Sequence, residues 1–184
     1  MFIVLEGIDG SGKTTLADIL NKKIPNSISL KENSDFVVEM KKNPKKAVEI
    51  FEGFCKERVE FGKKVQEQLS LGKIVIVDRY FPSSMCYQIG TCKERGFDCK
   101  ALINVYRRYY PQWLKPDLIL ILETELETCI ERIKERGEPV EEDILKKAQS
   151  CYESLGGIID NVYYIRNEKD AFSVIKLFKK ELVT

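Results

Sequence analysis

A glycine-rich segment near the N-terminus has the residue types and the spacing of a phosphate-binding loop. The segment from Gly7 to Thr14 fits G-x-x-x-x-G-K-[ST] at every position, directly after an apolar run and directly before a helical pattern. In such loops backbone N–H groups point at phosphate oxygens, the lysine reaches the β- and γ-phosphates, and the Ser or Thr hydroxyl joins Mg²⁺. We therefore predict a site for a nucleoside triphosphate and Mg²⁺, formed by Gly7, Asp9, Gly10, Ser11, Gly12, Lys13, Thr14 and Thr15.

A second polar cluster, Asp78-Arg79-Tyr80, follows the apolar run at residues 74–77. Open α/β sheets bind ligands at the carboxyl ends of their strands, which is where this cluster lies. Asp78 can hold Mg²⁺ through water, and Arg79 can clamp a phosphate with two parallel N–H groups. The alternative is a structural ion pair that caps the strand, but beside a phosphate loop the cluster favours a functional site.

Arg132 and Arg136 are four residues apart and share one face at the end of a predicted helix. They precede an acidic segment, 138–143, which contains a proline and is the best candidate for a mobile part of the chain. One interpretation is ordinary pairing of the arginines with the helix dipole, Glu131 or Glu135. The other is that the pair closes over a transferring phosphoryl group and balances its charge. The sequence favours neither.

The order of apolar runs and helical patterns predicts how these side chains are positioned. Runs at 2–5, 74–77 and 118–122 are apolar throughout, as in parallel strands covered on both faces. Two more strands are predicted at 27–30 and 162–165, and helices at 13–24, 45–71, 83–89, 100–109, 125–136, 141–155 and 171–182. We expect an α/β fold of three layers, the P-loop NTPase fold, with a five-stranded parallel sheet flanked by helices. Residues 1–184 would form a single P-loop domain, with a short helical lid at about 132–143.

Composition narrows the range of partners. The 30 basic and 29 acidic side chains give a formal net charge of +1, so no global field favours nucleic acid or an anionic membrane. No apolar run approaches the length of a membrane span, and we expect a soluble, cytoplasmic protein. The six cysteines include no C-x-x-C pair and the chain has no histidine, so we expect reduced, packed thiols and no zinc site or disulfide.

The absence of histidine also bears on the acceptor of a phosphoryl group. A hydroxyl acceptor usually needs a general base, whereas a phosphate monoester is largely ionised at neutral pH. A nucleotide acceptor would need arginines and positioning instead of a base. Glu6 or Glu123 could still serve as a base, so a hydroxyl acceptor stays open.

Taken together, the phosphate loop, the Asp78-Arg79-Tyr80 string and the paired arginines make the chain similar to a thymidylate kinase over most of its length. A GTPase would be expected to carry N-K-x-D, and the nearest string, residues 167–170, has its lysine one place late. The resemblance implies transfer of the γ-phosphoryl group of ATP to dTMP, with Mg²⁺, in an enzyme that is commonly a homodimer. A kinase of another pyrimidine nucleotide or of a deoxynucleoside is the nearest alternative. A nucleotide-binding regulatory module is the alternative of a different class.

The resemblance also implies roles for the residues of the acceptor site. Phe54 would stack on thymine, and Arg58, four residues later on the same helix face, would hydrogen-bond a base carbonyl. Asp9 would contact the 3′-hydroxyl or the acceptor phosphate. In the string Ser83-Ser84-Met85-Cys86-Tyr87-Gln88, the Ser84 position would face the base edge and the Tyr87 position would pack under the sugar. Gln88 belongs to the same string and is assigned to the acceptor site with it.

The chain departs from the family pattern at three places. Lys31-Glu32-Asn33 replaces an Arg/Lys-Glu-Pro string, and the lid after Gly137 is acidic where the family is usually basic. Gly10 occupies a loop position where some members carry a catalytic arginine, so Arg132 or Arg136 would have to supply that charge.

Overall fold

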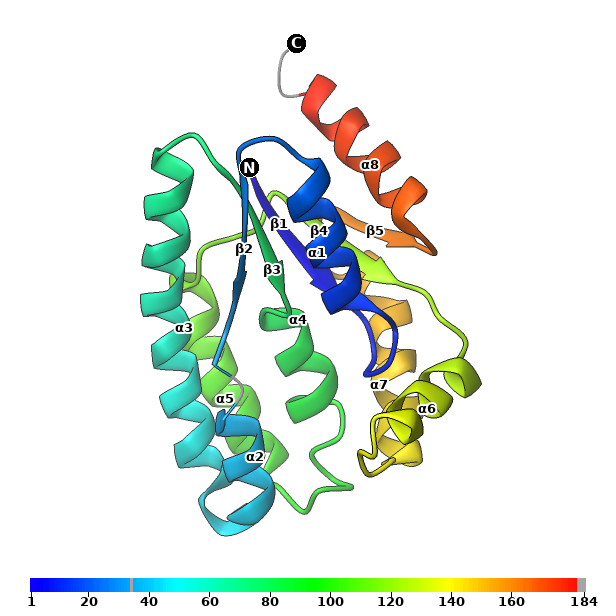
Figure 1. The fold of residues 1–184 in the computed structure, drawn as a ribbon. Helices are drawn as coiled ribbons and strands as arrows, with labels where there is room; N and C mark the ends of the chain where they lie inside the picture. The colour runs from blue at the N-terminus through cyan, green and yellow to red at the C-terminus, as the bar shows by residue number, and fades with distance from the viewer. Residues whose placement is uncertain (34, 182–184) are drawn as a thin grey trace.

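The computed structural model describes residues 1–33 and 35–181, which are built around a five-stranded parallel sheet (Figure 1). The strand order is β2-β3-β1-β4-β5. Successive strands are therefore added on one side of β1 and then on the other, so the crevice at the carboxyl end of β1 is the place where such a sheet binds ligands. The strands are β1 (Phe2–Glu6), β2 (Ser27–Lys31), β3 (Ile74–Asp78), β4 (Leu118–Leu122) and β5 (Val162–Ile165).

Helices connect the strands and cover both faces of the sheet (Figure 1). They are α1 (Lys13–Lys23), α2 (Asp35–Lys42), α3 (Ala47–Ser70), α4 (Phe81–Ser83), α5 (Cys99–Tyr109), α6 (Leu126–Glu135), α7 (Glu142–Ser154) and α8 (Glu168–Glu181). Short 3₁₀ turns, η1 (Pro44–Lys46), η3 (Tyr110–Gln112) and η4 (Leu155–Gly157), flank α3, α5 and α7. A π-helical segment, η2 (Ser84–Ile89), continues α4. Within the described residues no helix has both the length and the apolar composition that a membrane span requires.

The sheet separates two apolar layers, because successive side chains of a strand point to opposite faces. On β1, Phe2 and Val4 belong to the core under α3, α5 and α7, whereas Ile3 and Leu5 belong to the core under α1 and α8. All five residues of β1 and all five of β4 are buried, which explains why residues 2–5 and 118–122 are apolar without alternation. The predicted three-layer α/β fold is confirmed.

The helix boundaries differ from the prediction at a few places. The long helix begins at Ala47 because residues 44–46, which start with a proline, form a 3₁₀ turn. Helix α8 begins at Glu168, three residues before the predicted start, and the predicted end at Leu182 lies outside the described residues. Helix α2 was not predicted. It has eight residues and only Met40 is buried, so its sequence carries little periodic signal.

The prediction that all cysteines are reduced is wrong for two of them. Cys92 and Cys99 form a disulfide with a Cα–Cα distance of 5.4 Å. The chain turns between them at Gly96, which has a φ of +67°, a conformation that glycine adopts without a steric cost. This turn brings together two cysteines that lack the C-x-x-C spacing. Cys55, Cys86, Cys129 and Cys151 are free thiols, and the first three are buried, as predicted.

Candidate active site

The loop between β1 and α1 curls through three glycines that adopt positive φ angles. Gly7, Gly10 and Gly12 have φ of 138°, 83° and 101°. The curl lets the Lys13 ammonium fold back, where it donates to the carbonyl of Ile8 at 2.7 Å and to the Ser11 hydroxyl at 3.3 Å. Burial and the nearby Arg79 lower the pKa of Lys13 to about 7. Within residues 1–33 and 35–181, the hydrogen bonds of this buried ammonium go to one carbonyl and one hydroxyl, neither of which is charged, so the site suits an anion.

A cavity of about 750 Å³ opens in front of this loop. We call it the P-loop cavity; it is lined by residues 9–16 with Asp78, Arg79, Arg132 and Arg136 among others. All the residues predicted for the phosphate site except Gly7 line this cavity, together with the two lid arginines. Gly7 has no room for a side chain, since a Cβ there would lie 2.9 Å from both the Leu122 carbonyl and the Ser11 hydroxyl.

Thr14 and Asp78 meet at the inner end of the P-loop cavity. The Thr14 hydroxyl donates to Asp78 Oδ2 at 2.6 Å. Within the described part of the chain, Asp78 Oδ1 is buried and has no hydrogen-bond partner. A buried carboxylate oxygen without a partner is costly in a folded protein, and hard oxygen ligands are those that Mg²⁺ prefers. These two residues therefore fit the Mg²⁺ site that the sequence predicts.

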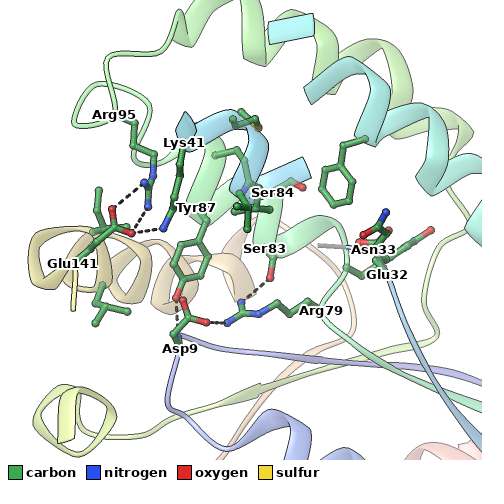
Figure 2. A pocket seen from close by; sticks show the side chains of 18 of the residues that line it. Asp9, Glu32, Asn33, Lys41, Arg79, Ser83, Ser84, Tyr87, Arg95 and Glu141 are labelled. Atoms are coloured by element: carbon green, nitrogen blue, oxygen red, sulfur yellow. Dashed lines mark hydrogen bonds and ion pairs between the residues drawn. The ribbon is translucent and has the colours of Figure 1, made fainter. Parts of the chain in front are cut away.

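Asp9 and Arg79 form an ion pair where the loop meets the end of β3. Arg79 Nη2 lies 2.5 Å from Asp9 Oδ1, and the backbone N–H of Asp9 donates to the Tyr87 hydroxyl at 2.8 Å, as Figure 2 shows. Burial alone would raise the pKa of Asp9, but the charges of Arg79 and Lys13 outweigh it and the pKa is lowered. Asp9 is therefore a carboxylate that faces across the site toward Arg79 and Tyr87.

Behind Arg79 lies a buried network around Glu6, which the sequence named only as a possible general base. Glu6 accepts hydrogen bonds from the backbone of Tyr80 at 2.7 Å, from the Ser83 hydroxyl at 2.6 Å and from the Tyr152 hydroxyl at 2.8 Å. Arg79 Nη1 donates in turn to Ser83 Oγ at 3.0 Å. Burial raises the pKa of Glu6, although the charge of Arg79 opposes this. A carboxylate at the end of a buried strand needs hydrogen-bond donors of this kind. The position of Glu6 directly after the apolar run 2–5 is therefore the sequence signal from which such donors could have been expected.

The two carboxylates named as possible general bases both point to other partners. Glu6 faces the network just described, and Glu123 pairs with Arg166 at 3.4 Å. Neither side chain is directed at the cavities that the phosphate loop and Arg79 line, so the structure gives no support to a hydroxyl acceptor activated by them.

A second cavity, of about 580 Å³, lies on the other side of Asp9 and Arg79. We call it the Arg58 cavity; the predicted acceptor residues Phe54, Arg58, Ser84, Tyr87 and Gln88 all line it. The Arg58 guanidinium lies 4.6 Å from the centre of the Phe54 ring, and its Nη1 donates to the Ser84 hydroxyl at 3.0 Å. The five residues that were predicted to form the acceptor site therefore surround one cavity.

Glu32 is the partner of Arg58, and the sequence did not assign it to the site. Arg58 Nε and Nη2 each donate to one carboxylate oxygen of Glu32 at 2.7 Å. Both side chains are almost fully buried, with 1% of Arg58 and 8% of Glu32 exposed. A buried arginine needs a carboxylate, and Glu32 belongs to the string that departs from the family pattern.

An ion cluster closes the opposite end of the Arg58 cavity. Arg95 binds both carboxylate oxygens of Glu141, at 3.1 and 3.2 Å, and Lys41 pairs with the same carboxylate (Figure 2). The cluster joins α2, the loop after η2 and the segment before α7. Glu141 belongs to the acidic segment 138–143, which was expected to be mobile, and the two cations hold its carboxylate in place. No local sequence pattern signals such long-range pairs.

The two lid arginines lie in different environments. Arg132 Nη1 donates to the carbonyl of Gly10 at 3.0 Å, so its guanidinium lies against the phosphate loop. Arg136 pairs with Glu138 at 3.0 Å, a partner other than the Glu131 or Glu135 considered from the sequence.

Gly10 has no space for a side chain of its own, because a Cβ there would lie 2.8 Å from Cys129 Cα on α6.

The family model and the curated relatives that match this chain agree on one family. The model of the thymidylate kinase family matches residues 5–172. A probable thymidylate kinase of Archaeoglobus fulgidus is 34% identical over 83% of this chain and 80% of its own length. Another, of Saccharolobus solfataricus, is 30% identical over 98% of this chain and 97% of its own.

Solved structures share the fold at lower identity. A thymidylate kinase from Candida albicans covers 97% of this chain and 89% of its own with a TM-score of 0.69 and 21% identity. A deoxyadenosine kinase from M. mycoides with bound dATP covers 100% of both chains with the same TM-score and identity. At this identity the solved structures show the fold alone. The family model and the two relatives show the family. On that basis the chain belongs to the thymidylate kinase family of enzymes.

Proposed function

We propose that this enzyme transfers the γ-phosphoryl group of MgATP to the phosphate of dTMP, giving ADP and dTDP. The observation that carries the proposal is that the P-loop cavity and the Arg58 cavity share a wall. Asp9, Asp78 and Arg79 line both cavities. Two separate sites that meet at an arginine and a candidate metal ligand are what a direct transfer between two nucleotides requires.

On the donor side, the backbone N–H groups from Gly7 to Thr15 would surround the phosphates of ATP. Lys13 would exchange the carbonyl of Ile8 for phosphate oxygens, and its pKa would rise beside them. Thr14 and Asp78 would hold Mg²⁺, which supplies charge compensation on the phosphates when it is bound.

On the acceptor side, the nucleotide would occupy the Arg58 cavity. Phe54 would stack on the base, and Arg58 and Ser84 would read its polar edge. Tyr87 would pack under the sugar with Gln88 beside it, and Asp9 would accept a hydrogen bond from the 3′-hydroxyl. The acceptor phosphate would then lie at Arg79, between the two cavities.

Catalysis would depend on positioning and charge. The acceptor phosphate is already ionised near neutral pH, so no residue has to remove a proton before transfer. Arg79 would exchange part of its contact with Asp9 for phosphate oxygens of both substrates. Arg132, which already lies at the carbonyl of Gly10, would supply the positive charge that Gly10 cannot carry, with Arg136 as the second lid arginine.

A substrate panel tests the proposal. Purified protein is incubated with MgATP and each of dTMP, dUMP, UMP, CMP, dCMP, AMP and thymidine, and ADP formation is followed. We expect the highest kcat/KM with dTMP. Turnover of thymidine but not of dTMP would replace the proposal with a deoxynucleoside kinase. Tight ATP binding without any acceptor-dependent turnover would replace it with a regulatory nucleotide-binding module.

The resemblance to the family further supports a single-domain homodimer that works in the cytoplasm. Light scattering of the purified protein tests the oligomeric part of this proposal. A mass near that of one 184-residue chain, at the concentration used for the assay, would overturn it.

A further inference from the structure

The guanidinium of Arg58 is held by more contacts than base recognition alone would require. A guanidinium has five N–H donors. Two of those on Arg58, on Nε and Nη2, go to the two oxygens of Glu32, and one on Nη1 goes to Ser84. The Phe54 and Trp113 rings lie 4.6 and 4.7 Å from its central carbon. Both the position and the rotation of the guanidinium plane are therefore fixed.

The same contacts decide what Arg58 can offer to a ligand. Among the residues that the structure describes, one N–H on Nη1 and one on Nη2 have no partner, because each terminal nitrogen carries two and one of each is already used. Both oxygens of Glu32 are bound to the guanidinium. This end of the Arg58 cavity therefore presents hydrogen-bond donors, and its carboxylate is engaged.

We propose that Glu32 sets the base preference of the acceptor site by fixing Arg58 in the orientation that presents only donors to the base. This rests on the proposed function, and it makes Glu32 a positioning residue that acts through Arg58. In a base with a carbonyl at its 4-position, such as thymine or uracil, the carbonyl oxygen can accept hydrogen bonds from the two free N–H groups of Arg58. In a base with an amine there, such as cytosine, the amine is itself a donor and faces the donors of Arg58. Its binding leaves these N–H groups of Arg58 buried without partners.

The energetic cost of that mismatch supports a strong preference. A site built to hydrogen-bond one group rejects an analogue mainly because its own buried polar groups are left unpaired. The cost depends on Arg58 being unable to turn away, and the two 2.7 Å bonds to Glu32 are what prevent this. Without Glu32, the guanidinium would rotate on its flexible stem, and the penalty for an amine would fall.

A double-mutant cycle tests the proposal. The variants are Glu32→Gln, Arg58→Met, which keeps an apolar stem between the rings, and the two combined. Turnover and calorimetric binding are measured with dTMP, dUMP and dCMP. We expect Glu32→Gln to raise KM for dTMP and dUMP by about tenfold, to change kcat little, and to lower the preference for dTMP over dCMP by at least about tenfold. In the Arg58→Met background, Glu32→Gln should change this preference by less than about twofold.

Two further variants serve as a control and as a substitute for Glu32→Gln. Glu52 lies on α3, as Arg58 does, and forms a more exposed pair with Arg108 on α5. Glu52→Gln breaks this pair and should change neither KM nor base preference. If Glu32→Gln does not fold, Glu32→Asp keeps the charge but is too short to hold both nitrogens equally, and it should lose part of the preference. Failure of both to fold would make Glu32 a residue of the fold and overturn the proposal.

Other outcomes also separate the alternatives. An unchanged ratio of dTMP to dCMP in Glu32→Gln would overturn the proposal, and so would an equal loss in the Arg58→Met background, which would mean that Glu32 contacts the nucleotide itself. A wild type that binds dTMP but does not turn it over would count against the proposed function alone, because base preference can still be measured by binding.

Discussion

Arg79 adopts a backbone conformation that residues other than glycine rarely adopt. Its φ is +71°, and such strain costs about 1–3 kcal/mol and persists only where the surroundings impose it. The surroundings here are Glu6, Ser83 and Asp9, which hold the backbone and both ends of the guanidinium. Strain of this kind gathers at functional sites, and this supports Arg79 as the residue shared by the two nucleotides.

The buried carboxyl of Glu6 predicts a pH dependence of stability. Burial raises its pKa in the fold above the usual value of 4.5. The stability linked to such a group is fully present below the unfolded pKa and is lost as the pH rises through the folded pKa. The free energy of unfolding of the wild type should therefore fall relative to that of Glu6→Gln as the pH rises from about 4.5. Urea denaturation at several pH values measures this, and a difference that stays constant with pH would contradict it.

Gly10 predicts a second effect at a single residue. An alanine there would adopt an unfavourable positive φ, and its Cβ would meet the backbone of Cys129 on α6. Gly72 has a similar φ of +74° but nothing within 4 Å, so Gly72→Ala isolates the backbone term of about 1–2 kcal/mol. We expect Gly10→Ala to lower the free energy of unfolding by more than Gly72→Ala does and, alone of the two, to raise KM for ATP. Equal effects on both measurements would show that the contact with α6 is unimportant.

At the scale of elements, α6 connects the phosphate loop to the lid. Its first turn packs Cys129 against Gly10, its last turn carries Arg132, and Arg136 directly follows its end. The helix dipole alone would explain arginines at this end, as the sequence allowed. The contact of Arg132 with the carbonyl of Gly10 distinguishes it from Arg136, whose partner Glu138 lies two residues further on.

This difference predicts unequal effects of the two arginines on catalysis. Arg132→Ala should lower kcat by about a hundredfold, the usual loss when one charge-stabilising donor is removed, with little change in KM for dTMP. Arg136→Ala should lower kcat by less than about threefold, because an exposed pair contributes little. Steady-state kinetics of both variants test this, with thermal melting as the control for folding. A larger loss for Arg136→Ala would reverse the assignment.

The element that the sequence did not predict, α2, closes the Arg58 cavity. Its Lys41 and the distant Arg95 share the carboxylate of Glu141. The loop that carries Arg95 is itself closed by the disulfide between Cys92 and Cys99. These contacts join residues far apart in the chain, and charged surface residues carry no periodic signal that would reveal such pairs.

At the scale of the whole molecule, the strands were predictable because apolar runs such as 118–122 have no alternation and so must be covered on both faces. The phosphate loop was predictable because its glycines and Lys13 have fixed spacing. The placement of Phe54, Arg58, Ser84 and Tyr87 around one cavity followed from helical spacing and from the family resemblance.

The partners of those residues could not be predicted in the same way. Glu32 and Glu6 are ordinary carboxylates in the sequence, and only the packing of β2 and β1 against their neighbours makes them the partners of Arg58 and of the Arg79 segment. Hydrogen bonds between distant side chains depend on the tertiary fold, whereas motif spacing depends on one local segment.

Product analysis shows directly whether one phosphoryl group moves between the two cavities. Purified protein with Mg²⁺, ATP and dTMP should form ADP and dTDP in equal amounts, and chelation of Mg²⁺ or the variant Lys13→Ala should abolish both products. Chromatographic separation of the four nucleotides gives the amounts. Consumption of ATP without matching dTDP would contradict transfer between the P-loop cavity and the Arg58 cavity.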